Sequence, residues 1–253
     1  MSSFPKVMKC RICSGAMRQF FATSTESLDE PFLSSDLRRE LRELRLDQCS
    51  QCGCLWAQDL RSDDAVLTRA YQNLVKDYFE TPPDEQRYKE FYRWLERLIE
   101  DHALGNDVLD VGCGDGLFLA SMSPRWSKQG VEPSSAGVEL ARKKNLKVFC
   151  GTLEDLPNGC RVDLLSALDV IEHVAEPHGF LEALKTKLKP GGVLLMSTPF
   201  DFRIHGPLPD CWRFTEHGIR ALLRDFASVE VTGLENENRF LMPLHYTTVA
   251  KKG

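Results

Sequence analysis

The chain has 253 residues with a formal net charge of −5, and 42% of its residues are hydrophobic. It can bury a sizeable core, so we expect one large domain with or without a small additional one. The mildly acidic charge disfavours a general nucleic-acid binder, no apolar run approaches the ~20 residues that span a bilayer, and the first ten residues lack the apolar core of a signal peptide. We therefore expect a cytoplasmic protein with no membrane partner. The sequence does not indicate an oligomeric state.

Near the N-terminus the chain carries two C-x2-C pairs, Cys10 with Cys13 and Cys49 with Cys52. In a cytosolic chain such pairs point to a metal and not to disulfides. Two pairs supply the four thiolates of a closed, tetrahedral structural site, so the spacing predicts Zn2+ in a zinc-ribbon-like module over residues 1–60. The alternative is four unrelated buried cysteines, and Cys54 is a less favoured substitute ligand for Cys52.

The 35 residues between the two pairs exceed the spacing of a compact zinc site, and a helical insert would account for the excess. We predict this helix over residues 37–46. It would begin after the cap Ser35-Asp36 and place on one face Leu37, Leu41 and Leu44. Its arginines alternate with glutamates, which favours a solvated face over an RNA contact. Residues 61–83 would then connect this module to the next domain.

From residue 84 to 253 helical and strand patterns alternate. A helix is predicted over residues 84–103, because four apolar residues form one stripe along it: Phe91, Leu95, Leu98 and Ile99. Strands are predicted at 107–111, 128–132, 146–150, 162–168, 192–198, 228–232 and 245–250. Such alternation predicts an α/β domain with a doubly wound, mostly parallel seven-stranded sheet covered on both faces.

The first strand runs into the sequence DVGCGDG, residues 110–116, and a helix follows. Glycines there permit a tight turn and a close approach to a ligand. The spacing is G-x-G-x-G and not the dinucleotide pattern G-x-G-x-x-G, and the flanking Asp110 and Asp115 would repel a phosphate. The turn therefore favours a cationic or zwitterionic ligand. The second strand ends at Glu132, where a carboxylate can accept hydrogen bonds from a ribose diol.

Together with DVGCGDG, the segments VEPSSAGVELAR, GTLEDLP, LLSALDVIEHV and LKPGGVLLMSTP resemble, in order, the class I S-adenosylmethionine-dependent methyltransferases. The resemblance covers residues 84–253 and implies S-adenosylmethionine as cofactor, with the last two strands as an antiparallel hairpin. It implies that the methionine end lies against Asp110, Gly112, Cys113, Gly114 and Gly116. The ribose would lie at Glu132 and the adenine against Pro133. The adenine amino group would face Thr152, Leu153 or Glu154, and Asp169 would complete the cofactor site. Some relatives that act on sugars and secondary metabolites carry a similar N-terminal zinc module.

The fourth strand leads into Asp169-Val170-Ile171-Glu172-His173, which faces the cofactor methyl group in this topology. His173 could take a proton from an acceptor hydroxyl. The D-x-x-E-H spacing also resembles the E-x-x-E-H set of metal-assisted O-methyltransferases, in which a divalent cation binds acceptor hydroxyls. We favour a base or a pocket wall over a structural cap, and Mg2+ at Asp169, Glu172 and His173 is the least favoured interpretation.

The loop over residues 200–215 is too rich in proline and aromatic residues for a helix. His205, Trp212 and Arg213 could form an acceptor pocket, and Arg213 suits a carboxylate or phosphate. The alternative is that Trp212 and Phe214 close the core, and for Phe214 we favour this packing role. A helix is predicted to begin near Thr215.

These observations favour a methyltransferase whose acceptor is a small molecule, plausibly a sugar or another hydroxylated metabolite. One alternative is an RNA or protein methyltransferase whose zinc module grips the substrate. The other is a scaffold that binds the cofactor without turnover, which an intact glycine turn and Glu132 disfavour.

Overall fold

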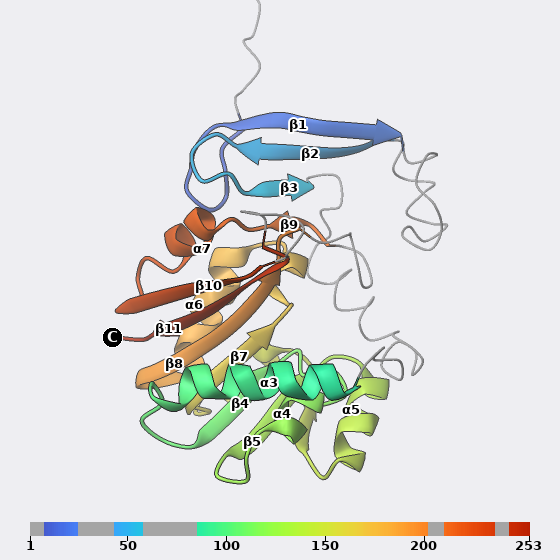
Figure 1. Ribbon diagram of the computed structural model, residues 1–253, viewed down its shortest axis with the longest axis vertical. Coiled ribbons are helices and arrows are strands. Elements are labelled where there is room, and N and C mark those ends of the chain that lie inside the picture. Colours follow the sequence, from blue (N-terminus) through green and yellow to red (C-terminus); the bar gives the residue numbers. More distant parts are fainter. Residues whose placement is uncertain (1–7, 25–42, 58–84, 202–209, 236–242) are drawn as a thin grey trace, which may run out of the picture.

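The computed structural model describes residues 8–24, 43–57, 85–201, 210–235 and 243–253 (Figure 1). These residues form two sheets. One has four strands in the order β1-β2-β3-β9, and the other has seven in the order β10-β11-β8-β7-β4-β5-β6. The larger sheet confirms the predicted α/β fold class.

All seven strands predicted from the sequence are present. They are β4 (Asp107–Val111), β5 (Ser127–Glu132), β6 (Lys147–Cys150), β7 (Val162–Leu168), β8 (Leu188–Pro199), β10 (Ser228–Leu234) and β11 (His245–Lys251). Neighbours from β6 through β8 pair in parallel, whereas β11 is antiparallel to both β8 and β10. The expected antiparallel hairpin at the sheet edge is therefore confirmed, and β8 begins earlier than the sequence predicted.

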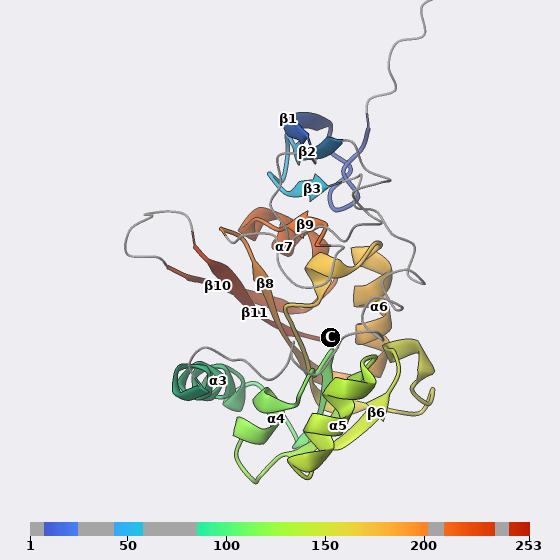
Figure 2. The ribbon, with the colours of Figure 1, turned by 90° about the vertical axis from the view of Figure 1, so that its right-hand side faces the viewer.

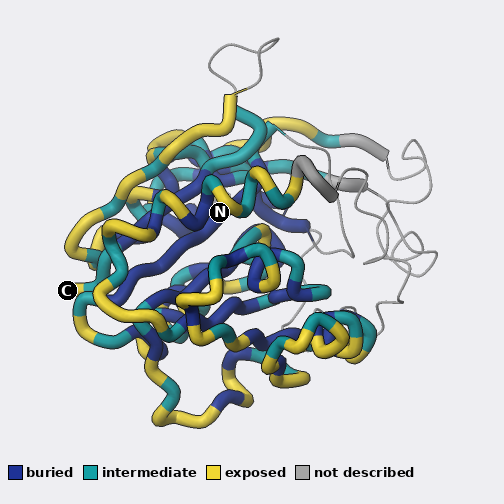
Figure 3. The backbone as a smooth tube through the Cα atoms, turned by 60° about the horizontal axis from the view of Figure 1, so that its bottom comes forward, coloured by how far each residue is buried: buried dark blue, intermediate teal, exposed yellow. Residues whose placement is uncertain are grey.

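Alternate residues of the strands lie on opposite faces of this sheet, and both faces are buried. On one face, Val108, Leu164 and Leu195 belong to an apolar cluster with three helices, α3 (Glu85–Glu100), α4 (Leu117–Ser121) and α5 (Ser135–Lys143). On the other face, the adjacent residues Leu109, Leu165 and Leu194 cluster with α6 (Pro177–Lys187) and α7 (Glu216–Leu222). Figure 3 shows the buried strands between partly exposed helices. The predicted stripe on α3 is confirmed, with Leu95 and Ile99 fully buried.

The small sheet joins the N-terminal cysteine module to the large domain. It consists of β1 (Met17–Ser24), β2 (Glu43–Cys49), β3 (Leu55–Ala57) and the distant β9 (Trp212–Arg213). β3 pairs antiparallel with β9, and Figures 1 and 2 both show β9 between β3 and the helices of the large domain. The module's buried residues also belong to the same apolar cluster as α6 and α7. The two parts therefore share one core.

The predicted helix over residues 37–46 is wrong for its last part, because Glu43–Cys49 is strand β2. Leu44 and Leu46 lie opposite Thr23 and Phe21 of β1 in an antiparallel ladder. Pairing with a partner strand outweighs the helical propensity of this arginine- and leucine-rich stretch. Leu37, Leu41 and the cap at Ser35-Asp36 lie outside the described residues.

Two short turns complete the part of the large domain that carries the site. They are the 3-10 turns η4 (Leu153–Asp155), which follows β6, and η5 (Ile171–His173), which follows β7. Thr215 caps α7 by accepting a hydrogen bond from the Gly218 N–H, so that helix begins where the sequence predicted. Across the described ranges no helix is long and apolar enough to span a membrane.

Candidate active site and cysteine cluster

The order of the large sheet reverses at β4, which lies between β5 and β7. In open α/β sheets, ligands bind beyond the carboxyl ends of the strands at such a reversal. Asp110 and Glu132 lie at the ends of β4 and β5, and Asp169 follows the end of β7. The topology thus gathers the predicted acidic residues at one edge of the sheet.

The glycine turn after β4 depends on backbone conformations that other residues rarely adopt. Gly112, Gly114 and Gly116 have φ values of 71°, 54° and 77°. A Cβ on Gly112 would lie 2.8 Å from a methyl group of Val170, in the segment after β7. The turn therefore lies directly against the D-x-x-E-H segment, and Gly116 leads into α4.

Asp110 is a buried carboxylate at the end of β4. Only 3% of the residue is exposed, and the Ser166 hydroxyl donates a 2.7 Å hydrogen bond to its Oδ1. Burial, together with the negative charge of Glu132, raises the pKa of Asp110 from 3.8 to about 7. A cationic group placed beside it would favour the ionised form, as the sequence argument expects.

Glu132 closes the other side of the glycine turn. Its carboxylate accepts hydrogen bonds from the N–H groups of Gly114 at 2.9 Å and Ser134 at 2.8 Å. Burial raises the pKa of Glu132 despite these hydrogen bonds. The half-buried Pro133 follows it. Cys113 contributes its backbone to the turn, while its buried thiol lies over Gly130, where a Cβ would come within 2.5 Å.

Tyr92 of α3 belongs to this site and was not predicted from the sequence. Its ring lies edge-on to Phe118, with centroids 5.4 Å apart. Burial raises the pKa of its hydroxyl, and so do the negative charges of Asp110 and Asp169. One available signal was the spacing of Tyr88 and Tyr92, four residues apart on one face of a helix that leads into β4.

The residues expected near adenine form the turn η4. The backbone N–H and hydroxyl of Thr152 both donate to Asp155, at 2.8 and 3.0 Å, and Leu153 is buried. Glu154 is exposed. Asp155 is thus the acid that closes this turn, and the roles of Thr152, Leu153 and Glu154 toward adenine stay predictions.

Asp169 begins the D-x-x-E-H segment, in a left-handed conformation with φ of 54°. The Ser197 hydroxyl donates to its Oδ1 at 2.8 Å, and His245 Nε2 lies 3.6 Å from its Oδ2. The D-x-x-E-H segment is therefore attached to β8 and β11 through its first acid.

Glu172 and His173 form the buried end of that segment. Glu172 is fully buried, His173 is 4% exposed, and His173 Nε2 lies 3.8 Å from Glu172 Oε1. Burial raises the pKa of Glu172 well above its usual value, and the charges of Asp169 and Asp210 act in the same direction. Within the described ranges, Asp169, Glu172 and His173 do not form a group of ligand atoms spaced for one metal ion.

The described end of the 200–215 loop, residues 210–215, packs against the core. Trp212 is 1% exposed and stacks with both Trp56 and Phe214, and Phe214 is fully buried, which confirms its predicted packing role. The guanidinium of Arg213 makes a two-pronged ion pair with Asp210, so it already holds a carboxylate of its own chain. His205 lies outside the described residues.

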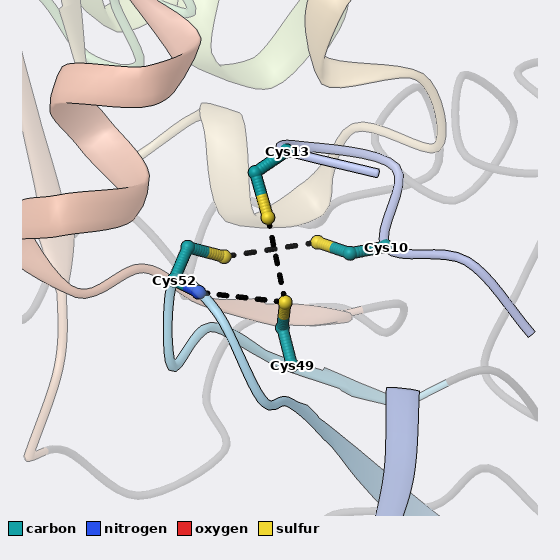
Figure 4. A group of neighbouring side chains, drawn as sticks. All are labelled: Cys10, Cys13, Cys49 and Cys52. Atoms are coloured by element: carbon teal, nitrogen blue, oxygen red, sulfur yellow. Dashed lines mark hydrogen bonds between the residues drawn. The ribbon is translucent and has the colours of Figure 1, made fainter. Parts of the chain in front are cut away.

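The four predicted zinc ligands converge (Figure 4). The sulfur atoms of Cys10, Cys13, Cys49 and Cys52 all lie within 4.8 Å of one another. Cys10 Sγ is 3.7 Å from Cys52 Sγ, and Cys13 Sγ is 3.4 Å from Cys49 Sγ. These separations exceed a disulfide bond and approach the ~3.8 Å between thiolates around tetrahedral zinc. The residues fit a structural Zn2+.

Without a cation, the crowding and burial of these thiols favour their protonated form. Hydrogen bonding with Cys52 and burial raise the pKa of Cys10, and burial raises the pKa of Cys13. A bound dication would reverse this and hold them as thiolates. Cys54, the alternative to Cys52, lies outside the group; its buried thiol lies against α7, 3.9 Å from Thr215 Oγ1.

Known proteins share this architecture. The ubiquinone biosynthesis O-methyltransferase of Nitrobacter winogradskyi is 38% identical over 101 residues, covering 37% of this chain and 39% of that protein. The mitochondrial enzyme of Schizosaccharomyces pombe is 33% identical over 104 residues, covering 37% of this chain and 38% of that protein. The matched part thus spans about two fifths of the length of these curated relatives.

Solved structures match a larger part of the fold. A possible histamine N-methyltransferase of Thermotoga maritima has a TM-score of 0.55 at 20% identity, covering 74% of this chain and all (100%) of that one. The magnesium protoporphyrin IX methyltransferase of Synechocystis gives 0.56 at 16% identity, covering 76% of this chain and 100% of that one. The family model described as a methyltransferase domain matches residues 84–238. The chain therefore belongs to the methyltransferase domain family, among the class I S-adenosylmethionine-dependent methyltransferases that its sequence resembles.

Proposed function

We propose that the protein transfers a methyl group from S-adenosylmethionine to a hydroxyl group of a small molecule. One observation carries the proposal: the glycine turn, with its buried carboxylates, lies against the segment that presents Glu172 and His173. The contact of Gly112 with Val170 joins the two. A cofactor held by the turn and an acceptor held by the segment would therefore meet at one sheet edge.

The cofactor side suits a ligand that carries positive charge. S-adenosylmethionine supplies a methyl group on a cationic sulfur and also carries an ammonium group. Asp110 would accept from the ammonium group, the backbone of the glycine turn would lie against the methionine end, and Glu132 would accept from the ribose. Asp110 and Glu132 are 3% and 4% exposed, so their interactions with a cation would be little screened by water.

The acceptor side supplies a proton acceptor. As the acceptor oxygen bonds to the methyl carbon and the carbon–sulfur bond breaks, the hydroxyl proton would move to a ring nitrogen of His173. Glu172 lies 3.8 Å from that ring, and in its ionised form it would stabilise the imidazolium. Most of the acceleration would come from alignment of oxygen, carbon and sulfur.

The class of acceptor is supported by the relatives, whose names state O-methylation in ubiquinone biosynthesis. A hydroxylated metabolite, whether a phenol or a sugar, fits the same chemistry. We further propose that the four-cysteine cluster binds Zn2+ as a structural ion, because four thiolates leave no open coordination position for a substrate.

The test uses methyl-labelled S-adenosylmethionine, the purified protein and an extract of its own cells, with products separated by size. The proposal is supported if label appears in the small-molecule fraction and treatment with base does not release it. A methyl ether resists base, whereas a methyl ester does not. Label in RNA or protein overturns the proposal, and so does label absent from every fraction while the cofactor binds.

The identified acceptor then tests the residues. Glu172→Gln and His173→Ala should lower kcat by about 100-fold, the usual share of a general base, while cofactor affinity stays within about twofold. Full turnover in both variants would show that His173 is not the general base. Glu182→Gln, in α6 and away from the sheet edge, is the matched control.

A further inference from the structure

We infer that the cysteine module positions the acceptor-side turn of the active site, with Arg11 as the positioning residue. Arg11 lies between the two cysteines of the first C-x2-C pair. Its guanidinium forms an ion pair with Glu176 and donates to the carbonyl of Ala175 at 3.4 Å. It also lies over the Trp56 ring, 4.7 Å from the centroid. One side chain of the module thus contacts the segment that follows the Glu172–His173 pair.

The same segment is held at two further points by Cys211 and by the adjoining Trp212 of β9, which is itself a strand of the module's sheet. The Cys211 N–H donates to the Glu172 carbonyl at 2.8 Å, and the Trp212 indole donates to the Val174 carbonyl at 3.0 Å. The Trp212 ring stacks on Trp56 with centroids 5.2 Å apart. Residues 172–176 therefore make hydrogen bonds along their length to groups whose positions depend on the module.

Two more contacts fix the module to the neighbouring elements. The Thr215 hydroxyl donates to the carbonyl of Cys52, and a ring nitrogen of His178 lies 3.0 Å from the carbonyl of Ile12. Both carbonyls belong to the loops that carry the cysteine pairs. These contacts link the loops that carry the cysteines to α6 and to the cap of α7.

In the part of the chain that the structure describes, the glycine turn has no hydrogen bond to the cysteine module. Its hydrogen bonds run to β5, to α4, to Lys144 after α5 and within the turn itself, and Asp110 bonds to β7. Loosening the module should therefore disturb the acceptor segment and leave the cofactor pocket intact. This asymmetry distinguishes positioning from a general contribution to folding.

The first test is amide hydrogen exchange on the full-length protein, and it does not depend on the proposed function. In Arg11→Gln, loss of the ion pair and hydrogen bond should speed exchange in residues 171–176 about tenfold, with exchange in residues 107–117 unchanged. Arg18→Gln changes an exposed arginine of the same module and is the matched control. The zinc content of each variant, measured with a chromogenic chelator, shows whether the module is still folded.

Glu176→Gln removes the same ion pair by changing its partner in the large domain, and it leaves the module's own residues unchanged. It should reproduce the local change, and the double variant should exceed neither single variant by more than about twofold. Unchanged exchange in 171–176 in both single variants overturns the inference. Equal acceleration in 107–117 overturns it as well, because that pattern would be general destabilisation.

The kinetic test rests on the proposed function and uses the acceptor found by labelling. Arg11→Gln should lower kcat about tenfold while cofactor affinity changes less than about twofold, because the catalytic pair is misaligned and the pocket is intact. If no acceptor is methylated even by the unaltered protein, the proposed function fails and the exchange result still decides the positioning role. A wild-type kcat in Arg11→Gln would overturn the inference.

Discussion

The two sides of the sheet edge are built in different ways. The proposed cofactor side centres on one run of sequence, residues 110–132, in which a strand, a glycine turn and a helix lead to the next strand. The proposed acceptor side combines residues 169–178 with residues 210–215 and with the cysteine module, whose contacting residues lie more than 150 positions away. The first is fixed by local backbone geometry and the second by long-range pairing.

This difference indicates which residues can be substituted without loss of cofactor binding. The glycine turn needs particular φ values, and Asp110 and Glu132 are buried, so that side tolerates little change. Between η5 and α6, residues 174–176 have no regular structure and are hydrogen-bonded by Trp212 and Arg11. A change in the module should therefore alter the proposed acceptor side first.

The largest expected effect is a loss of methyl transfer with cofactor binding retained. Cys49→Ser removes one ligand of the proposed zinc site, and loss of a structural zinc should unfold the small sheet. We expect zinc stoichiometry to fall to zero and methyl transfer to fall by more than about 100-fold, with cofactor affinity within about threefold. Metal analysis, turnover and calorimetric titration measure the three.

Cys150→Ser is the matched control, because Cys150 is exposed and lies outside the cluster. It should leave all three quantities unchanged. Retention of zinc in Cys49→Ser would contradict the metal assignment. A parallel loss of cofactor binding would contradict the independence of the two sides.

A substitution in the glycine turn's strand should do the opposite, weakening cofactor binding while the cysteine module stays folded. Asp110→Asn removes a buried charge that would face the cofactor cation, at an expected cost of about 3 kcal/mol, or ~100-fold in affinity. Titration calorimetry measures the affinity, and zinc content should remain at the unaltered value. Asp107→Asn, at the start of the same strand and paired with Lys189, should leave affinity unchanged. Unaltered affinity in Asp110→Asn would remove this carboxylate from the cofactor site.

The contrast between the two sides also decides how much could be predicted from the sequence. The strand at 107–111, the glycine turn and Glu132 follow from short-range patterns, and the structure places them as predicted. The four cysteines could be matched by spacing, because the chemistry of the ion requires them to converge.

Pairing between distant segments could not be predicted. No periodicity in residues 212–213 indicates a strand, because the strand exists only where β3 offers an unpaired edge. The same cause made the last part of the helix predicted over residues 37–46 wrong, since β1 pairs with that stretch. Tyr92 was missed because the influence of the Asp110 and Asp169 charges on its hydroxyl depends on how α3 packs against the sheet.

A smaller change should affect both sides at once, because it lies at their contact. Gly112→Ala places a Cβ at φ of 71° and within 2.8 Å of Val170. Strain and displacement of Val170 should lower the free energy of unfolding by about 2 kcal/mol. Chemical denaturation measures this, and both cofactor affinity and kcat should fall. Gly159→Ala, where a Cβ meets nothing within 4 Å, is the control. An effect confined to one side would show that Val170 moves freely.

The smallest expected effect sharpens the electrostatic account of the cofactor side. The pKa of Asp110 is raised from 3.8 to about 7, so in the free protein this carboxyl binds a proton that the unfolded chain has already released. Between pH 4 and 7 the unliganded protein therefore loses stability at this group as the pH rises. A cationic ligand favours the ionised form, so its binding releases the proton and its affinity rises with pH.

With a pKa near 7 the ionised fraction of Asp110 grows about eightfold from pH 6 to pH 7.5, and affinity for S-adenosylmethionine should rise by the same factor. Glu132, whose pKa is also raised by burial, would steepen the rise at the acidic end. Titrations at matched ionic strength measure the slope, and repeating them in two buffers of different ionisation enthalpy measures the proton released. In Asp110→Asn the slope should flatten toward the part due to Glu132. An unchanged slope in that variant would assign the pH dependence to Glu132 and leave Asp110 ionised before the cofactor arrives.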